Sequence, residues 1–100
     1  MDLRVGRVTR AEVNAAARKP AYKLWIDFGP LGSKTSSAQL VNRYAADELV
    51  GRQVVAAMDL GTKRIAGFDS EVLVLGVPDA DGKTILLMPA REVPLGGQVS

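Results

Sequence analysis

Apolar and polar residues alternate most regularly over residues 22–28, YKLWIDF. The apolar side chains of this stretch fall on every second position: Tyr22, Leu24, Ile26 and Phe28. Period-two alternation of this kind predicts a β-strand with one buried face. The glycine- and proline-rich residues 29–32 predict a turn, and the polar, β-branched residues 34–40 predict the return strand of a hairpin.

Other stretches with the character of β-strands are residues 4–13, 53–58, 72–77 and 83–88. Gly6 interrupts the first of them and predicts a bulge or a sharp bend there. The apolar run at 72–75 predicts a strand covered on both faces. Residues 78–82 end in Asp-Gly and predict the turn of a second hairpin.

One helix is expected, at residues 42–50, NRYAADELV. Its length corresponds to about two turns, and Gly51 follows its last apolar residue as a typical stop. Residues 14–20 contain a run of alanines, but a proline at their end prevents a helix from continuing, so we expect a loop. The C-terminal residues 91–100 predict only short extended pieces, around Val93 and Val99.

The order of these elements predicts the fold class. Five or six short strands, a single short helix between the third and the fourth strand, and the absence of a βαβ rhythm indicate an all-β protein. We predict a five-stranded Greek-key barrel of the oligonucleotide/oligosaccharide-binding (OB) type, with extended terminal segments. A small β-sandwich is the competing architecture. A chain of 100 residues buries one modest core, so residues 1–100 are expected to form one domain.

The composition narrows the chemistry. The chain has neither cysteine nor histidine, which excludes disulfides and removes the commonest general base and metal ligand. Ser36 and Ser37 therefore have no histidine to activate them. We expect a protein that is not an enzyme and that uses no cofactor and no metal. No apolar stretch is long enough to span a membrane, and the charged N-terminal residues do not resemble a signal peptide, so a cytoplasmic location without membrane insertion is expected.

The candidate binding residues are polar or cationic. Residues 35–39, TSSAQ, place hydrogen-bonding side chains on a predicted strand, where they either face water on an edge or line a groove. The loops contribute the cations Arg18, Lys19, Lys63 and Arg64. If these two loops share one rim of the barrel, they form a positive mouth that can contact phosphates. The net charge of +2 is small, and by itself does not indicate a nucleic-acid ligand.

Two aromatic residues have more than one interpretation. Trp25 lies on the otherwise polar face of its strand, where it packs against a partner strand, contacts a second subunit or stacks on a ligand. Phe68 follows the Ala66-Gly67 turn and either closes the end of the barrel or is exposed for stacking.

Several motifs together resemble the CsaA family, bacterial proteins that consist of one OB fold of the tRNA-binding type. The matching segments are DLRVGRV at 2–8, ARKPAYKLWIDFG at 17–29, SSAQL at 36–40, RIAGFDSEVLVLG at 64–76 and PAREVPLGGQV at 89–99. The match extends over nearly the whole chain, and the SSAQ and RIAGF elements are the most specific parts of it.

The resemblance implies a homodimer of barrels with a groove in each subunit. The residues that it places in the groove are Ser36, Ser37, Gln39, Lys63, Arg64, Ile65, Gly67, Phe68 and Ser70, with Arg18 and Lys19 as additional cationic contacts. It also implies a secretion-related chaperone that binds unfolded export precursors and the translocation ATPase. Because the wider family includes tRNA-binding modules of synthetases, a tRNA-binding protein is the second hypothesis.

The chain departs from the family pattern just before the RIAGF motif. Residues 59–62 read Asp-Leu-Gly-Thr, where family members usually have Asn-Phe-Pro-Pro. Loss of the two prolines predicts a less rigid loop, and the carboxylate of Asp59 is expected to disfavour a phosphate nearby.

Overall fold

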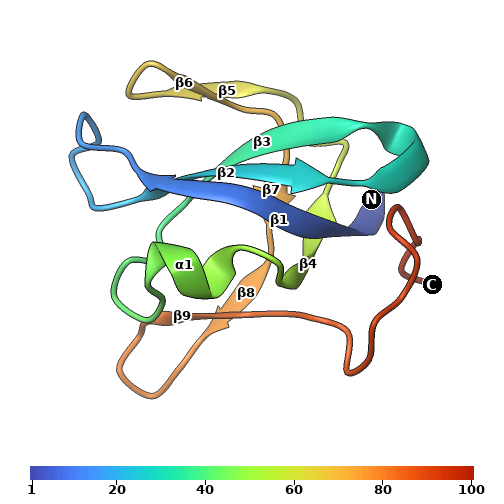
Figure 1. Cartoon of the computed structure of the whole chain (residues 1–100). Coiled ribbons are helices and arrows are strands. Elements are labelled where there is room, and N and C mark those ends of the chain that lie inside the picture. Colours follow the sequence, from blue (N-terminus) through green and yellow to red (C-terminus); the bar gives the residue numbers. More distant parts are fainter.

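A computed structural model describes all residues, 1–100, and has a five-stranded antiparallel sheet with the strand order β3-β2-β1-β4-β7. Its strands are β1 (Leu3–Val13), β2 (Tyr22–Asp27), β3 (Ser33–Ala38), β4 (Gln53–Ala57) and β7 (Leu73–Val74). Two hairpins extend from it: β5 (Lys63–Ile65) with β6 (Phe68–Ser70), and β8 (Gly76–Pro78) with β9 (Thr84–Leu86). They lie on opposite sides of the sheet (Figure 1).

The sheet curls into a nearly closed barrel, which confirms the predicted OB-type fold. The N-terminal half of β1 pairs with β4 and its C-terminal half pairs with β2, so the strand takes part in both halves of the barrel. Closure occurs at Thr35, whose carbonyl accepts hydrogen bonds from the backbone N–H groups of Glu71 (2.8 Å) and Val72 (3.1 Å). These bonds join β3 to the segment that leads into β7, at the opposite end of the strand order.

The sequence predicted a bulge or bend at Gly6, but the bulge in β1 lies at Thr9. The pairing of β1 with β2 shifts by one residue between Val8 and Arg10, which leaves Thr9 without an opposite residue. Gly6 has a different role, because a Cβ atom there would lie 2.5 Å from Cγ2 of Ile26 and 2.7 Å from Cε1 of Phe28. The glycine is therefore required by the close approach of core side chains rather than by a bend.

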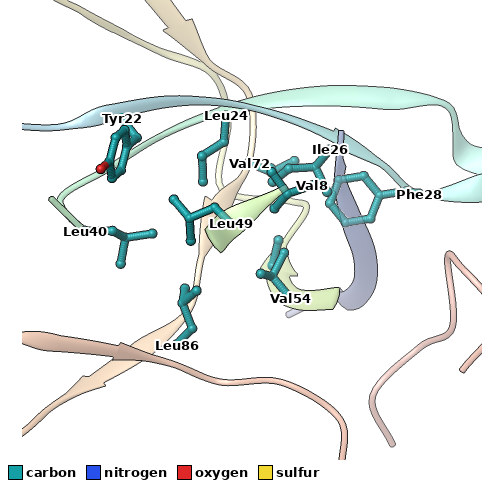
Figure 2. Close-up of a cluster of buried hydrophobic side chains, with 11 residues drawn as sticks. Val8, Tyr22, Leu24, Ile26, Phe28, Leu40, Leu49, Val54, Val72 and Leu86 are labelled. Atoms are coloured by element: carbon teal, nitrogen blue, oxygen red, sulfur yellow. The ribbon is translucent and has the colours of Figure 1, made fainter. Parts of the chain in front are cut away.

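The core fills the inside of the barrel (Figure 2). Leu24, Ile26 and Phe28 of the alternating stretch are fully buried, as the period-two pattern predicts. The remaining buried apolar cluster consists of Val8, Tyr22, Leu40, Leu49, Val54, Ala56, Val72 and Leu86. Leu49 comes from the short helix, which lies between the sheet and the β8–β9 hairpin (Figure 1).

The helix lies between β3 and β4, as predicted, but α1 (Ala46–Leu49) is only one turn long. Tertiary hydrogen bonds hold Tyr44 outside it. The hydroxyl of Tyr22 donates to the Tyr44 carbonyl at 2.7 Å, and the Tyr44 hydroxyl accepts from the backbone N–H of Leu86 at 3.1 Å. The N-cap residue Ala45 also has no side-chain oxygen that could accept a hydrogen bond from the free N–H groups of the first turn.

The prediction of a strand buried on both faces at 72–75 is wrong. Val72 is buried, but Leu73 is 47% exposed. The run is short and lies at the end of the sheet, so only one of its faces meets the core. The C-terminal segment is extended near Val99, as expected: the N–H of Val99 donates to the Leu3 carbonyl at 2.9 Å and that of Val5 to the Gly97 carbonyl at 3.0 Å.

Gly6→Ala is expected to destabilise the protein by about 1–3 kcal/mol, because the added methyl group overpacks the contact between Ile26 and Phe28. Chemical denaturation measured by fluorescence of Trp25 gives the change in free energy of unfolding. Ser33→Ala, at an exposed position of β3, is the matched control and should change stability by less than about 0.5 kcal/mol. An unchanged stability of Gly6→Ala would contradict the close packing of Ile26 and Phe28 against Gly6.

Candidate ligand-binding groove

The RIAGF motif forms the tip of the β5–β6 hairpin. Ile65 pairs with Phe68, so the loop between the strands has only two residues. Both have positive φ angles, 48° at Ala66 and 79° at Gly67. This is the pattern of a type I′ turn, whose twist matches that of the two strands. The glycine adopts this conformation without strain, whereas Ala66 does so against its preference.

Hydrogen bonds hold the base of the hairpin on β3. The Thr35 hydroxyl lies 2.7 Å from the Asp69 carbonyl oxygen and 2.9 Å from the Glu71 carboxylate, which also accepts the backbone N–H of Thr35 at 3.0 Å. Beside them, the Ser70 hydroxyl accepts the N–H of Ser37 at 3.0 Å and donates to the Val72 carbonyl at 3.2 Å. The polar side chain of Thr35, which could equally have faced water, is thus used inside the chain.

Aromatic packing fixes the hairpin to β2. The rings of Trp25 and Phe68 meet edge to face, with centroids 5.4 Å apart. The guanidinium of Arg10 lies 4.5 Å from the centroid of the Trp25 ring, and the ammonium of Lys23 lies 5.8 Å from that of Phe68. Phe68 therefore neither closes the barrel end nor stands free, and Trp25 has partners within its own chain.

Two hollows flank the hairpin. The first, about 630 Å³, lies between the hairpin tip and the loop at 14–21, and we call it the cationic hollow. Its lining residues are Ala16, Ala17, Arg18, Lys19, Ala21, Ser37, Gln39, Arg64, Ile65 and Ala66. The second, about 380 Å³, is the apolar hollow. Its lining residues are Ser37, Leu60, Gly61, Lys63, Ile65, Ser70, Val72 and Leu73. Ser37 and Ile65 belong to both, so the two hollows adjoin along β5; together they are the hairpin groove.

The hairpin groove thus brings together the two segments that the sequence singled out. Ser37 and Gln39 come from the polar strand and its end, and Lys63, Arg64, Ile65 and Ser70 come from the hairpin. Arg18 and Lys19 lie at the rim of the cationic hollow, so the two cationic loops do share one side of the barrel.

Three of the expected groove residues lie elsewhere. Ser36 is fully buried, because it pairs with Leu24 and points into the core, so it cannot line the groove. Gly67 forms the turn and Phe68 covers Trp25, and neither lines a hollow. Side chains on β3 alternate between the two faces of the sheet, which is why Ser37 is accessible and Ser36 is not.

Sequence reasoning missed the small and apolar part of the lining. These residues are Ala16, Ala17, Ala21, Leu60, Gly61, Ala66, Val72 and Leu73. Leu60 and Leu73 are 48% and 47% exposed, and both line the apolar hollow. The alanine run in the cation-bearing loop was the only available signal, since it leaves space beside Arg18.

Only one of the four cationic side chains that line the groove has an ion-pair partner within the chain. Arg64 forms an ion pair with Asp69 at 2.8 Å, whereas Arg18, Lys19 and Lys63 form no ion pair within the chain. Asp59 does not line either hollow. A hydrogen bond from the backbone N–H of Asp2, at 3.0 Å, lowers the pKa of the Asp59 carboxyl and directs its charge toward the N-terminal strand.

The structure contains no group of three or more histidine, cysteine, aspartate or glutamate side chains placed to hold a metal ion. None of its helices has the length and apolar character that a membrane span requires.

An OB-type barrel with an open, partly apolar and partly cationic groove on its side defines a binding module. A family profile described as "Putative tRNA binding domain" matches residues 3–98. Among solved structures, chaperone CsaA of Bacillus anthracis is 54% identical, with a TM-score of 0.91 over 99% of this chain and 90% of that one. CsaA chaperone protein of Picrophilus torridus is 44% identical, also with a TM-score of 0.91, over 99% of this chain and 91% of that one.

The chain therefore belongs to the CsaA family, whose members carry this tRNA-binding-type domain. It is also similar to part of a much longer protein. Methionine–tRNA ligase of Porphyromonas gingivalis is 39% identical over 99 residues, which are 99% of this chain but only 14% of the ligase.

Thr35→Val is expected to loosen the hairpin, because it removes the hydroxyl that binds Asp69 and Glu71. Loss of about 1–1.5 kcal/mol would speed hydrogen exchange of the amides at 63–70 roughly tenfold. Thr84→Val, a threonine of β9 whose hydroxyl makes no hydrogen bond, is the control and should leave that exchange unchanged. Equal exchange in wild type and Thr35→Val would mean that the hydroxyl does not hold the hairpin.

Proposed function

We propose that this protein is an export-related molecular chaperone that binds unfolded precursor proteins or peptides in the hairpin groove. The observation that carries the proposal is the mixed lining of the groove. Apolar residues such as Leu60, Ile65 and Leu73 form one part of it, and the cations Lys19 and Lys63 lie beside them. An unfolded chain offers both aliphatic and acidic side chains, and a groove of this kind accommodates both without demanding one sequence. Identity of 54% to a CsaA chaperone supports the same function.

The proposal extends to partners and location. The protein acts as a non-enzymatic binding protein in the cytoplasm, where it meets export precursors before they fold and delivers them to the translocation ATPase. The CsaA proteins that are 54% and 44% identical to it are chaperones, whereas the match to the ligase of Porphyromonas gingivalis covers only 14% of that enzyme.

Binding of tRNA is the second candidate function, favoured by the unpaired cations. Arg18, Lys19 and Lys63 form no ion pair within the chain, so their charges are available to phosphates. The family profile supports the same ligand. Together with Arg64, which is ion-paired with Asp69, the three unpaired cations make four in the groove, and they would give at most a slope of about −3 to −4 for log K against log salt.

Binding titrations at about 50 mM and about 200 mM salt distinguish the two functions. If the chaperone proposal is correct, an unfolded precursor binds with a smaller dependence on salt than tRNA shows, and tRNA binds more weakly. If tRNA is the main ligand, its binding falls steeply with salt, and Lys63→Ala with Arg64→Ala reduces the slope by about 2. Lys34→Ala with Arg91→Ala is the control, because it removes the same charge outside the groove. Absence of precursor binding under all these conditions would refute the chaperone function.

We further propose that the protein is a homodimer, joined through the outer face of the β8–β9 hairpin. Val77 and Ile85 pair across this hairpin, opposite the face that buries Leu86, and they are 50% and 36% exposed. Leu87 continues the same face and is 40% exposed. An exposed apolar patch of this kind is typical of an interaction site, and a two-fold dimer uses the same patch on both subunits. This face replaces Trp25 as the candidate interface, because Trp25 is covered by Phe68 and Arg10.

Light scattering is expected to give twice the chain mass of 10.6 kDa at micromolar concentration. Ile85→Glu should convert the protein to a monomer, because it buries a charge in the proposed interface. Leu31→Glu places the same charge at another exposed apolar position, 43% exposed, and should leave the mass unchanged. A wild-type protein of 10.6 kDa at this concentration would refute the dimer.

A further inference from the structure

Strand β5 has a free edge inside the hairpin groove. Its sheet contains only β5 and β6, and no residue of β5 makes a backbone hydrogen bond beyond this hairpin. All three of its residues, Lys63, Arg64 and Ile65, are exposed. A strand edge in this state presents unsatisfied N–H and C=O groups to whatever enters the groove.

The register of the hairpin identifies the residue whose backbone faces outward. Ile65 and Phe68 flank the two-residue turn and form a hydrogen-bonded pair, so the next pair, Arg64 and Asp69, is not hydrogen-bonded across the hairpin. The backbone N–H and C=O groups of the two residues in such a pair point away from each other. The Asp69 carbonyl does so, since it accepts the Thr35 hydroxyl on the β3 side. The N–H and C=O of Arg64 therefore point to the opposite side, toward the free edge.

Space for one extended chain lies beside this edge. The cationic hollow extends from Arg64 to Ser37 and Gln39 of the barrel wall, and the small side chains of Ala16 and Ala17 keep it open. Ile65 is shared with the apolar hollow, on the other face of the hairpin strand from Arg64. A strand placed along β5 would thus direct its side chains alternately toward the two hollows.

We propose that an unfolded polypeptide binds by adding a β-strand to the free edge of β5, with backbone hydrogen bonds to Arg64. This inference rests on the peptide-binding function proposed above and specifies its mode. Side chains on the Arg64 face enter the cationic hollow, whose free cations Arg18 and Lys19 favour acidic groups. Side chains on the other face enter the apolar hollow beside Leu60 and Leu73, which favour aliphatic groups. The preferred client is an extended segment in which acidic and aliphatic residues alternate.

Strand addition suits a protein that must accept many sequences. Backbone hydrogen bonds do not depend on the client's side chains, whereas the two hollows supply a mild preference. The charge of Lys63, which forms no ion pair within the chain, also opposes pairing between two copies of β5. An acidic client strand meets no such repulsion.

A proline substitution tests the backbone bond directly. Arg64→Pro removes the outward N–H without breaking a bond to β6, and Arg64→Ala removes the same side chain but keeps the N–H. The probe is a fluorescent peptide of about nine alternating glutamate and valine residues, which is within the usual range of strand lengths. We expect Arg64→Ala to weaken its binding a few-fold and Arg64→Pro to weaken it about tenfold further. Emission of Trp25, which contacts Phe68, reports whether the hairpin is intact in both variants.

N-methylation of the peptide provides the second measurement. Each peptide of the series carries a methyl group on one backbone amide. Methylation of an amide that faces β5 should abolish binding, whereas methylation of the amides that alternate with it and face away should be tolerated. This series decides the question even if Arg64→Pro disturbs the hairpin. Equal affinity of the two Arg64 variants, with all N-methylated peptides still bound, overturns strand addition but leaves peptide binding in place. No binding of the peptide or of an unfolded precursor to wild type overturns both. If the wild type does not bind the peptide, and the two Arg64 variants weaken tRNA binding equally, the groove is an RNA-binding site.

Discussion

The contact between Thr35 and residues 69–72 is the constraint on which the rest of the structure depends. Its backbone half closes the barrel, since the Thr35 carbonyl accepts the N–H groups of Glu71 and Val72. Its side-chain half fixes the hairpin, since the hydroxyl binds the Asp69 carbonyl and the Glu71 carboxylate. Fold closure and groove geometry are thus set by one residue, and a change that opens one loosens the other.

The outer face of β2 and β3 serves as a platform rather than as the binding surface itself. The ring of Trp25 packs against Phe68, the Thr35 hydroxyl donates to the Asp69 carbonyl, and the N–H of Ser37 donates to the Ser70 hydroxyl. These contacts engage β6 and leave β5 free on the far side of the hairpin. The groove is therefore formed by what the platform does not cover: the edge of β5, the cations of the 14–20 loop and the exposed leucines.

Much of this could be predicted from local patterns. The alternation at 22–28 predicts β2, the Ala66-Gly67 pair predicts the turn, and the position of the helix between β3 and β4 follows from the order of elements. Failures occurred where distant residues intervene. The helix is short because Tyr22 holds Tyr44 outside it, and the bulge lies at Thr9 because β1 changes partners near that point.

The sequence by itself determined the fold class and the two segments that form the groove, because side-chain periodicity and turn preferences act over a few residues. Only the tertiary structure decided which of those side chains reach a ligand. Ser36 and Ser37 are adjacent and identical, yet the register of β3 against β2 buries the first and exposes the second. In the same way, only the packed hairpin determines that Asp69 faces β3 and that the backbone of Arg64 faces the open groove.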